Sequence, residues 1–296
     1  MSGPKVAVLG AGSYFFGKPV IWNMVKSEVL SGGTLAMVDT NAHTLKTMMD
    51  LGQRAVDATD SPTKIIGSTD RREVLKDCDF VVLSFSNDNA WYRGLDTRIS
   101  KKYGITMCSS DTIGPGGIFR AMRELPEVMD ICRDIEELCP NAWLINFINP
   151  TSVLGIGLMR YAPNVKSFAL CDGNHLPYAK ANFMRLCQVI ANDEEPTQEM
   201  LDKFEYKVGG VNHCTFLTEC SYDGEDRMPY VRKTIEENSL KEWRNGPNFK
   251  AKPRLNFDYA LQLMDIYGAF PTAVSHTKEY VPFFQGYGVS PTTPEP

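Results

Sequence analysis

The sequence has no apolar run long enough to cross a membrane, and its first residues lack the charged and then apolar pattern of a secretion signal. Only four histidines are present, and the eight cysteines follow no regular spacing. A chain of 296 residues is also too long for a small disulfide scaffold, so most of the thiols should be buried and reduced. These absences predict a cytoplasmic protein with no membrane partner.

Neither charge is in large excess. Charged residues make up 23% of the chain, and the formal net charge is −5. A mildly acidic surface does not favour nucleic acid or an anionic membrane as a partner. Apolar residues make up 43%, which is enough for the core of one large domain or two ordinary ones.

In the first part of the chain, short apolar runs alternate with helical patterns. This alternation predicts an α/β fold with a Rossmann-like, doubly wound parallel sheet. Sites in such sheets lie beyond the carboxyl ends of the strands. Pro19 should delay the regular part of the first helix until about Lys18. The expected strands are 5–10, 34–39, 64–67, 79–84, 142–147 and 167–170, and the expected helices are 13–27, 41–57 and 118–138.

The alternation of strands and helices changes from about residue 166, where a last strand would be followed directly by Cys171. A helix over 176–191, strands over 204–208 and 214–221, and a polar stretch of helix and loop over 225–260 predict a second, α+β domain. We therefore divide the chain into 1–170 and 171–296. The turn-rich tail closes no element, so the second domain should be incomplete at its C-terminus.

Gly10-Ala11-Gly12-Ser13 follows a strand and leads into a helix. Glycine lets the backbone approach a pyrophosphate, and the free amides of a helix start bind it. Phe15 stands where a third glycine belongs, so an ordinary glycine-rich turn is also possible. Asp39 ends the second strand, where a carboxylate favours NAD over NADP or is simply solvated. The predicted cofactor-binding residues are Gly10, Gly12, Ser13, Tyr14, Asp39 and Asn87.

Two further turns fall near the predicted site. Glycines 114–117 precede a helix that carries Arg120 and Arg123. They form either a turn with a helix cap or a tight loop that brings an arginine to the cofactor cleft. Asn149-Pro150 ends a strand and is either a turn or a source of a substrate hydrogen bond.

Cys171 and His213 are candidate metal ligands, although each could instead be a core residue. Two protein ligands leave open positions, as catalysis requires, and a soft donor favours zinc or another transition metal. Asp172 is a candidate general acid or a loop carboxylate. His276 and Tyr280 would share one helical face, either as site residues or as ordinary surface and core residues.

Taken together, the motifs resemble the NAD- and metal-dependent glycoside hydrolases of family 4. This group contains α-galactosidases, α-glucosidases, α-galacturonidases and 6-phospho-glucosidases. The matching segments run in order along nearly the whole chain: 8–13, 93–104, 114–119 with Arg123 and Pro126, 149–150, 171–172, 210–213 and 276–282.

The resemblance implies a lactate/malate dehydrogenase-like nucleotide domain with an appended substrate domain. In this family NAD oxidises the sugar 3-hydroxyl, which acidifies the C2 proton. A base removes that proton while a divalent metal, usually manganese, holds the enediolate. The aglycone is eliminated with the help of an acid, water adds, and the hydride returns to C3. The family is an exception to hydrolysis by two carboxylates.

By position, the resemblance implies that Cys171 and His213 bind the metal. Asn149 would contact substrate and metal, with Arg93 and Asn212 as further substrate-binding residues. Family members are longer than this chain, and their C-terminal helical part helps to build the site and a dimer. A homodimer or homotetramer is therefore expected.

The resemblance also implies which residues act as the catalytic acid and the catalytic base. Asp172 matches the acid of the phospho-α-glucosidase members and would also contact substrate. Many members have a tyrosine base three residues after a proline, but Val274 stands there, after Pro271. His276 is nearest to that position, and Tyr280 is the reserve; an imidazole is a suitable base near neutral pH.

The sequence from 171 to 175 differs from both the Cys-His and the phospho-sugar forms of the motif, and there is no cationic cluster for a sugar phosphate. A non-phosphorylated hexoside or uronide is therefore the expected substrate, with sugar and anomer left open. Two other functions remain: an NAD-dependent dehydrogenase of the 2-hydroxy-acid type, and a non-catalytic NAD- or sugar-binding protein. The dehydrogenase is disfavoured because no His-Gly-Asp stretch is present.

Overall fold

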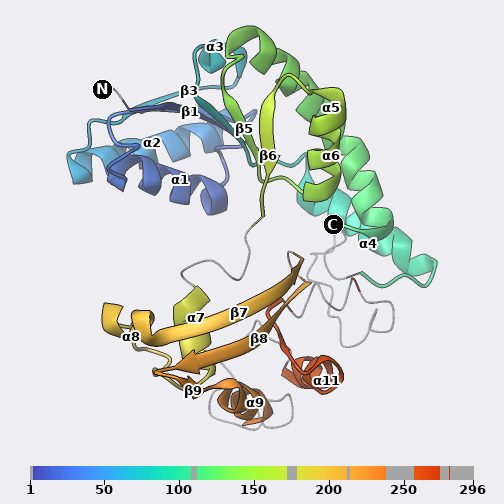
Figure 1. Ribbon diagram of the computed structural model, residues 1–296. Helices are drawn as coiled ribbons and strands as arrows, with labels where there is room; N and C mark the ends of the chain where they lie inside the picture. Colours follow the sequence, from blue (N-terminus) through green and yellow to red (C-terminus); the bar gives the residue numbers. More distant parts are fainter. Residues whose placement is uncertain are drawn as a thin grey trace. The chain divides into compact units, whose positions relative to one another are not determined.

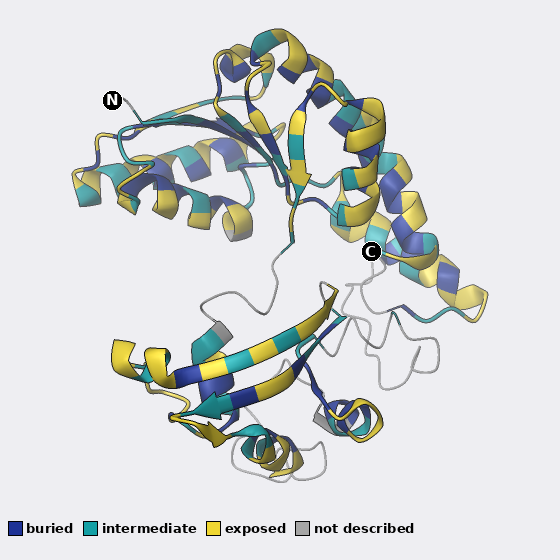
Figure 2. Cartoon of the chain, in the orientation of Figure 1, coloured by how far each residue is buried: buried dark blue, intermediate teal, exposed yellow. Residues whose placement is uncertain are grey.

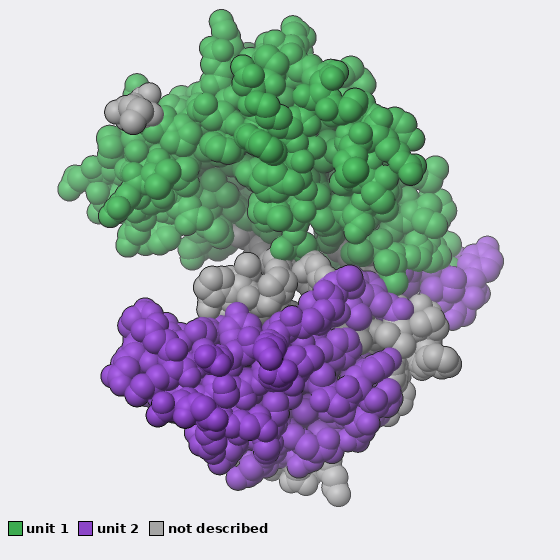
Figure 3. All heavy atoms as spheres, in the orientation of Figure 1, with its two compact units in different colours: residues 1–99, 110–171, 293–296 green, residues 100–109, 172–292 purple. Residues whose placement is uncertain are grey.

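The computed structural model describes residues 3–107, 112–171, 179–211, 214–237, 257–273 and 280 (Figure 1). The chain divides into two compact units (Figure 3). The first comprises residues 1–99, 110–171 and 293–296, and the second comprises residues 100–109 and 172–292.

The first unit is built on a six-stranded sheet in the order β3-β2-β1-β4-β5-β6. Every strand pair in it is parallel, which confirms the predicted doubly wound fold. The strand order reverses between β1 and β4, and ligands of such sheets bind at that point. The strands are β1 (Lys5–Leu9), β2 (Thr34–Val38), β3 (Lys64–Ser68), β4 (Phe80–Leu83), β5 (Trp143–Asn146) and β6 (Lys166–Ala169).

Alternate residues of the strands enter two separate cores (Figure 2). On one face, Val6 and Val8 of β1 pack with helices α1 (Tyr14–Lys26) and α2 (Ala42–Thr59). On the other, Ala7 and Leu9 join a larger cluster with α3 (Arg72–Leu75), α5 (Gly114–Leu138) and α6 (Thr151–Tyr161). Helices on both faces leave only the strand ends open to a ligand.

Two helices begin earlier than the sequence predicts. Helix α1 begins at Tyr14 rather than near Lys18, because the Ser13 hydroxyl caps it by accepting from the Phe16 amide at 3.4 Å. Pro19 lies inside the helix and removes only one backbone donor. Helix α5 begins at Gly114, which takes a left-handed φ of 67° at the entry.

The second unit pairs an antiparallel sheet with helices, as the predicted α+β domain requires. Strands β10, β8 and β7 lie in that order, and β9 pairs with β8. Phe204, Leu217 and Tyr259 lie in its buried core. Its elements are α7 (Ala179–Leu186), α8 (Gln198–Lys203), β7 (Phe204–Val211), β8 (Cys214–Tyr222), β9 (Glu225–Asp226), α9 (Met228–Glu237), α11 (Phe257–Tyr267) and β10 (Phe270–Pro271), and α4 (Asn89–Lys102) spans the boundary with the first unit.

Cysteine placement agrees with the expected reduced thiols. Seven cysteines fall within the described ranges, and all seven are free. Five of them are buried, whereas Cys171 and Cys214 are partly exposed. Burial raises the pKa of the Cys78 and Cys132 thiols to about 12, which keeps them protonated. In the part of the chain that the structure describes, no helix has the length and apolar character of a membrane span.

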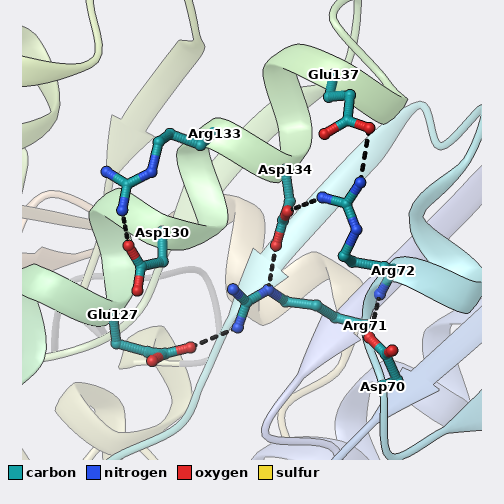
Figure 4. A network of polar contacts seen from close by, with 8 residues as sticks. All are labelled: Asp70, Arg71, Arg72, Glu127, Asp130, Arg133, Asp134 and Glu137. Atoms are coloured by element: carbon teal, nitrogen blue, oxygen red, sulfur yellow. Dashed lines mark hydrogen bonds and ion pairs between the residues drawn. The ribbon is translucent and has the colours of Figure 1, made fainter.

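Helix α3 is only four residues long, and an ion network fixes it to α5 (Figure 4). Asp134 accepts a hydrogen bond from Arg71 Nε at 2.6 Å and another from Arg72 Nη1. Glu127 accepts from Arg71 at 2.5 Å, and Glu137 accepts from Arg72 at 2.7 Å. Burial alone would raise the pKa of Asp134, but the hydrogen bonds from both arginines outweigh it and lower that pKa.

We expect Asp134→Ala to lower the free energy of unfolding by about 1–3 kcal/mol. This is less than the ~3–5 kcal/mol lost when a fully buried pair is broken, since both arginines stay partly exposed. Urea unfolding at neutral pH measures the change. Asp50→Ala removes the exposed pair with Lys46 and should cost no more than about 0.5 kcal/mol. Equal losses in the two variants would show that the network does not anchor α3.

Candidate functional site

A cleft of about 900 Å³ opens at the carboxyl ends of the parallel strands. Gly10 follows β1, Asp39 follows β2, Asn87 belongs to the loop after β4, and Asn149 follows β5; all four line the cleft. Every described residue that lines it belongs to the first unit. The cleft therefore lies beyond the carboxyl ends of the strands, as the sequence predicts, and at the point where the strand order reverses.

Gly10 makes the turn between β1 and α1, and its position admits no side chain. Its φ is 92°, and a Cβ there would lie 2.5 Å from the carbonyl oxygen of Ser84 and 2.8 Å from Phe85 Cα. The amides of Gly10 and Ala11 both donate to the Val38 carbonyl at 2.9 Å. The turn is thus held against the ends of both β2 and β4, directly below the open cleft.

Ser13 lines the cleft at the N-terminus of α1. The first turn of this helix contains no acidic residue, so its amides and dipole can attract an anion. Gly17 takes over the packing role of the third glycine that the motif lacks. A Cβ there would lie 2.9 Å from Met48 Cε of α2 and 3.0 Å from the Ala11 carbonyl oxygen, so Gly17 allows α1 and α2 to approach closely.

Asp39 is held in place by two backbone amides. Its Oδ2 accepts from the Gly12 amide and its Oδ1 accepts from the Asn41 amide, each at 2.9 Å. A Cβ at Gly12 would lie 2.6 Å from Asp39 Oδ2, so a side chain there would displace the carboxylate from this position. The carboxylate is therefore a positioned acceptor in the cleft rather than a freely solvated strand end.

The loop after β4 is fastened by a buried carboxylate that the sequence did not reveal. Glu124 of α5 is 1% exposed, and its Oε1 accepts from the Ser86 hydroxyl at 2.6 Å. Burial raises the pKa of Glu124, while the Ser86 hydrogen bond and the charge of Arg120 act in the opposite direction. Glu124 thus supports the cleft wall from behind, since Ser86 and Arg120 both line the cleft.

The two arginines of α5 have different surroundings. Arg120 lines the cleft, and its Nε lies 3.9 Å from Glu124 Oε1. Arg123 instead pairs with Asp96 at 2.6 Å and lies 4.8 Å from the centre of the Tyr92 ring. The glycine-led helix therefore does bring an arginine to the cleft, and that arginine is Arg120.

At the β5 end, Asn149 lines the cleft and accepts a hydrogen bond from Thr151 Oγ1 at 2.9 Å. The buried Asn146 side chain fixes the turn before it, bonding both the carbonyl and the amide of Ile148 at 3.0 and 3.3 Å. Cys171 comes just beyond β6, whose Ala169 is paired with Asn146. Asn149 and Cys171 thus follow the carboxyl ends of neighbouring strands.

The remaining predicted residues differ in what the structure describes. Arg93 lines the cleft, whereas Tyr14 is 63% exposed and is not among the residues that line it. Tyr280 is a half-buried helical residue of the second unit. Among the described residues, no three His, Cys, Asp or Glu side chains form a metal-binding group. Asp172, Asn212, His213 and His276 lie outside the described residues.

Comparison with known proteins identifies the family. Residues 5–184 match the model of the family 4 glycosyl hydrolases, and residues 208–287 match the C-terminal domain of the same family. The chain belongs to glycosyl hydrolase family 4. An alpha-galactosidase of Bacillus subtilis is 30% identical over 285 residues, which cover 95% of this chain and 60% of that protein. The family 4 chain thus spans about 60% of the length of this relative.

Solved structures bear out the predicted fold. A 6-phospho-alpha-glucosidase from gut microorganisms, in complex with NAD and Mn²⁺, superposes with a TM-score of 0.70 at 19% identity, over 95% of this chain and 63% of that one. A lactate dehydrogenase from Eimeria maxima superposes with a TM-score of 0.52 at 16% identity, over 93% of this chain and 73% of that one. The family 4 chain therefore has the predicted dehydrogenase-like architecture.

Gly10→Ala should lower the free energy of unfolding by about 1–3 kcal/mol or more, since a strained backbone alone usually costs that much. It should also abolish dinucleotide binding at the turn. Gly32→Ala is the matched control, because Gly32 also has a positive φ of 83° but its nearest contact is 3.5 Å away. Urea unfolding and calorimetric titration measure both effects. If the two variants lose the same stability, the close approach to β4 is not what requires glycine.

The raised pKa of Glu124 gives a second expectation. A buried carboxyl that holds its proton more firmly in the folded state opposes folding once the pH exceeds its ordinary pKa of 4.5. This opposition grows until the pH passes the raised pKa. Glu124→Gln, which cannot ionise, should therefore gain stability relative to the unmodified protein as the pH rises from mildly acidic to neutral. Unfolding curves at several pH values test this, and a constant difference would refute it.

Proposed function

We propose that this family 4 protein is a glycosidase that requires NAD and a divalent metal ion, and that Mn²⁺ is the preferred ion. Family membership supports the glycosidase activity, and the relative solved with NAD and Mn²⁺ supports both cofactors. The observation that carries the proposal is the cleft built around Gly10, Ser13 and Asp39, because its shape and charge fit a dinucleotide.

Different residues of the cleft would bind different parts of the dinucleotide. The Gly10 turn lets the backbone approach a pyrophosphate, and the amides at the start of α1 offer it hydrogen bonds. The fixed carboxylate of Asp39 is an acceptor for a ribose hydroxyl. Asn87 and Arg93 line the cleft farther along the sheet edge, where the reactive part of the dinucleotide and the sugar would lie.

The proposed reaction consists of C3 oxidation of the sugar, C2 deprotonation, elimination of the aglycone, addition of water and re-reduction. Bound NAD would supply reversible hydride transfer at C3, and a bound divalent ion would supply Lewis acidity toward the sugar. Cys171 and His213 have the donor chemistry to hold that ion, and the amide of Asn149 would contact the substrate and the ion.

Three further residues complete the proposal. Asp172 would donate a proton to the leaving group. His276, with Tyr280 in reserve, would remove the C2 proton.

We propose a non-phosphorylated hexoside or uronide as substrate, which the relationship to an alpha-galactosidase supports. The same proposal includes a homodimeric or homotetrameric assembly in the cytoplasm and a nucleotide domain that ends near residue 170. The boundary between the two units next to Cys171 supports that division.

The reaction is tested with a panel of aryl glycosides in D₂O, with NAD, Mn²⁺ and a thiol reductant present. We expect aglycone release that depends on both cofactors, deuterium at C2 of the sugar product, and no net NADH. Chelation of the metal should abolish release. Product that carries no deuterium at C2 would reject the elimination route.

A dehydrogenase of the 2-hydroxy-acid type is the second candidate, favoured by the lactate dehydrogenase-like fold. The same assay, with a hydroxy acid added as substrate, distinguishes the two functions. A dehydrogenase would accumulate one NADH for each hydroxy acid that it oxidises and would release no aglycone. Binding of NAD without either activity would instead indicate a non-catalytic binding protein.

A further inference from the structure

Besides Asp39, the end of the cleft next to β2 and β3 is lined by residues that the proposed function does not use. Thr69, Asp70 and Arg71 follow β3 and line the cleft, as does Asp39 after β2. Because an acid at the end of the second strand normally binds the ribose of the adenosine half, this end would hold the adenosine of a dinucleotide. This step rests on the proposed use of NAD.

Arg71 is held there by two carboxylates of α5 (Figure 4). Its Nε donates to Asp134 at 2.6 Å, and its Nη1 donates to Glu127 at 2.5 Å. Both bonds lie along the edges of the guanidinium and therefore fix its plane, while the side chain stays 26% exposed. Figure 4 shows the guanidinium lying between the two acids, which themselves line the cleft.

The charges around Arg71 do not suit a phosphate. Arg71 and Arg72 are paired with three carboxylates, those of Glu127, Asp134 and Glu137. Asp39 adds a further negative charge to the same cleft. A 2′-phosphate would have to displace these carboxylates from the arginines, which is costly because charge-assisted bonds to arginine are strong. The arginines are therefore unsuited to bind the extra phosphate of NADP.

A guanidinium whose Nε and Nη1 donate to carboxylates still has its flat face. Arginine stacks well on aromatic rings, and a base stacked on such a side chain is bound without regard to its hydrogen-bonding pattern. The clamp also removes most of the rotamer freedom that an arginine would otherwise lose on binding. These features describe a preformed surface for a flat, neutral ring.

We propose that Arg71 is the adenine-binding residue of the cleft and that its two carboxylate partners help to select NAD over NADP. The guanidinium face stacks on the adenine ring. Glu127 and Asp134 hold that face in place, and their negative charge repels a 2′-phosphate.

The test is a set of calorimetric titrations of the full chain with NAD, ADP and nicotinamide mononucleotide. Arg71→Ala should weaken NAD and ADP binding by about ten- to a hundredfold, the range that loss of one base stack produces. Binding of nicotinamide mononucleotide should stay unchanged. Arg133→Ala is the matched control: it removes the same charge from an exposed pair with Asp130 on α5, outside the cleft, and should change nothing.

Two conservative variants separate stacking from charge and from misfolding. Arg71→Lys keeps the charge but loses the plane, so it should bind ADP almost as weakly as Arg71→Ala. Full recovery by lysine would overturn the stacking interaction. Glu127→Gln keeps the side-chain shape but removes one negative charge, so the ratio of NADP to NAD affinity should rise. No change in that ratio would overturn the role of the carboxylates in selection.

The outcomes also separate this inference from the proposed function. If the unmodified protein binds NAD, and the Arg71→Ala variant binds NAD and ADP as tightly as the unmodified protein does, the proposed adenine site is wrong while the glycosidase proposal stands. If the unmodified protein binds ADP in an Arg71-dependent manner but turns over no glycoside, the adenine site stands and the glycosidase proposal fails. If it binds neither NAD nor ADP, the adenine site is overturned directly.

Discussion

The close fit of the Gly10 turn against the end of β4 is the constraint on which the rest of the site depends. A side chain at Gly10 would meet the backbone of Ser84 and Phe85, so the β1 turn and the β4 loop can approach only because Cβ is missing. Their approach places the start of α1, Asp39 and Asn87 around one cleft. The reversal of strand order opens the cleft, and the glycine determines how near a ligand can come to the backbone.

Carboxyl groups of helix α5 set much of the charge in the cleft. Glu124 is buried behind the loop after β4, where burial raises its pKa and the Ser86 hydroxyl bonds it. Glu127 and Asp134 lie farther along the same helix and hold Arg71, while arginine hydrogen bonds lower the pKa of Asp134. One helix therefore supports two ends of the cleft in different ways: through a buried carboxyl that bonds Ser86, and through carboxylates that accept hydrogen bonds from arginines.

The sequence predicted the parts of this structure that local patterns control. Apolar runs bounded by turns gave the strands, and glycine before a helix gave the cofactor turn with Asp39 beside it. The long-range contacts were beyond such reasoning, because Arg71 and its partners are separated by 56 and 63 residues. Helix α4 was missed since its sequence is polar and contains Gly94, so tertiary contacts such as the Arg123–Asp96 pair outweigh weak local propensity.

The distribution of residues between the two units has a consequence for function. All the described residues that line the cleft belong to the first unit, so the proposed dinucleotide site is built on the packing of that unit. The two proposed metal ligands are assigned to different units: Cys171 to the first and His213 to the second. Under the proposed function, binding of the dinucleotide and turnover of a glycoside therefore draw on different sets of residues of this family 4 chain.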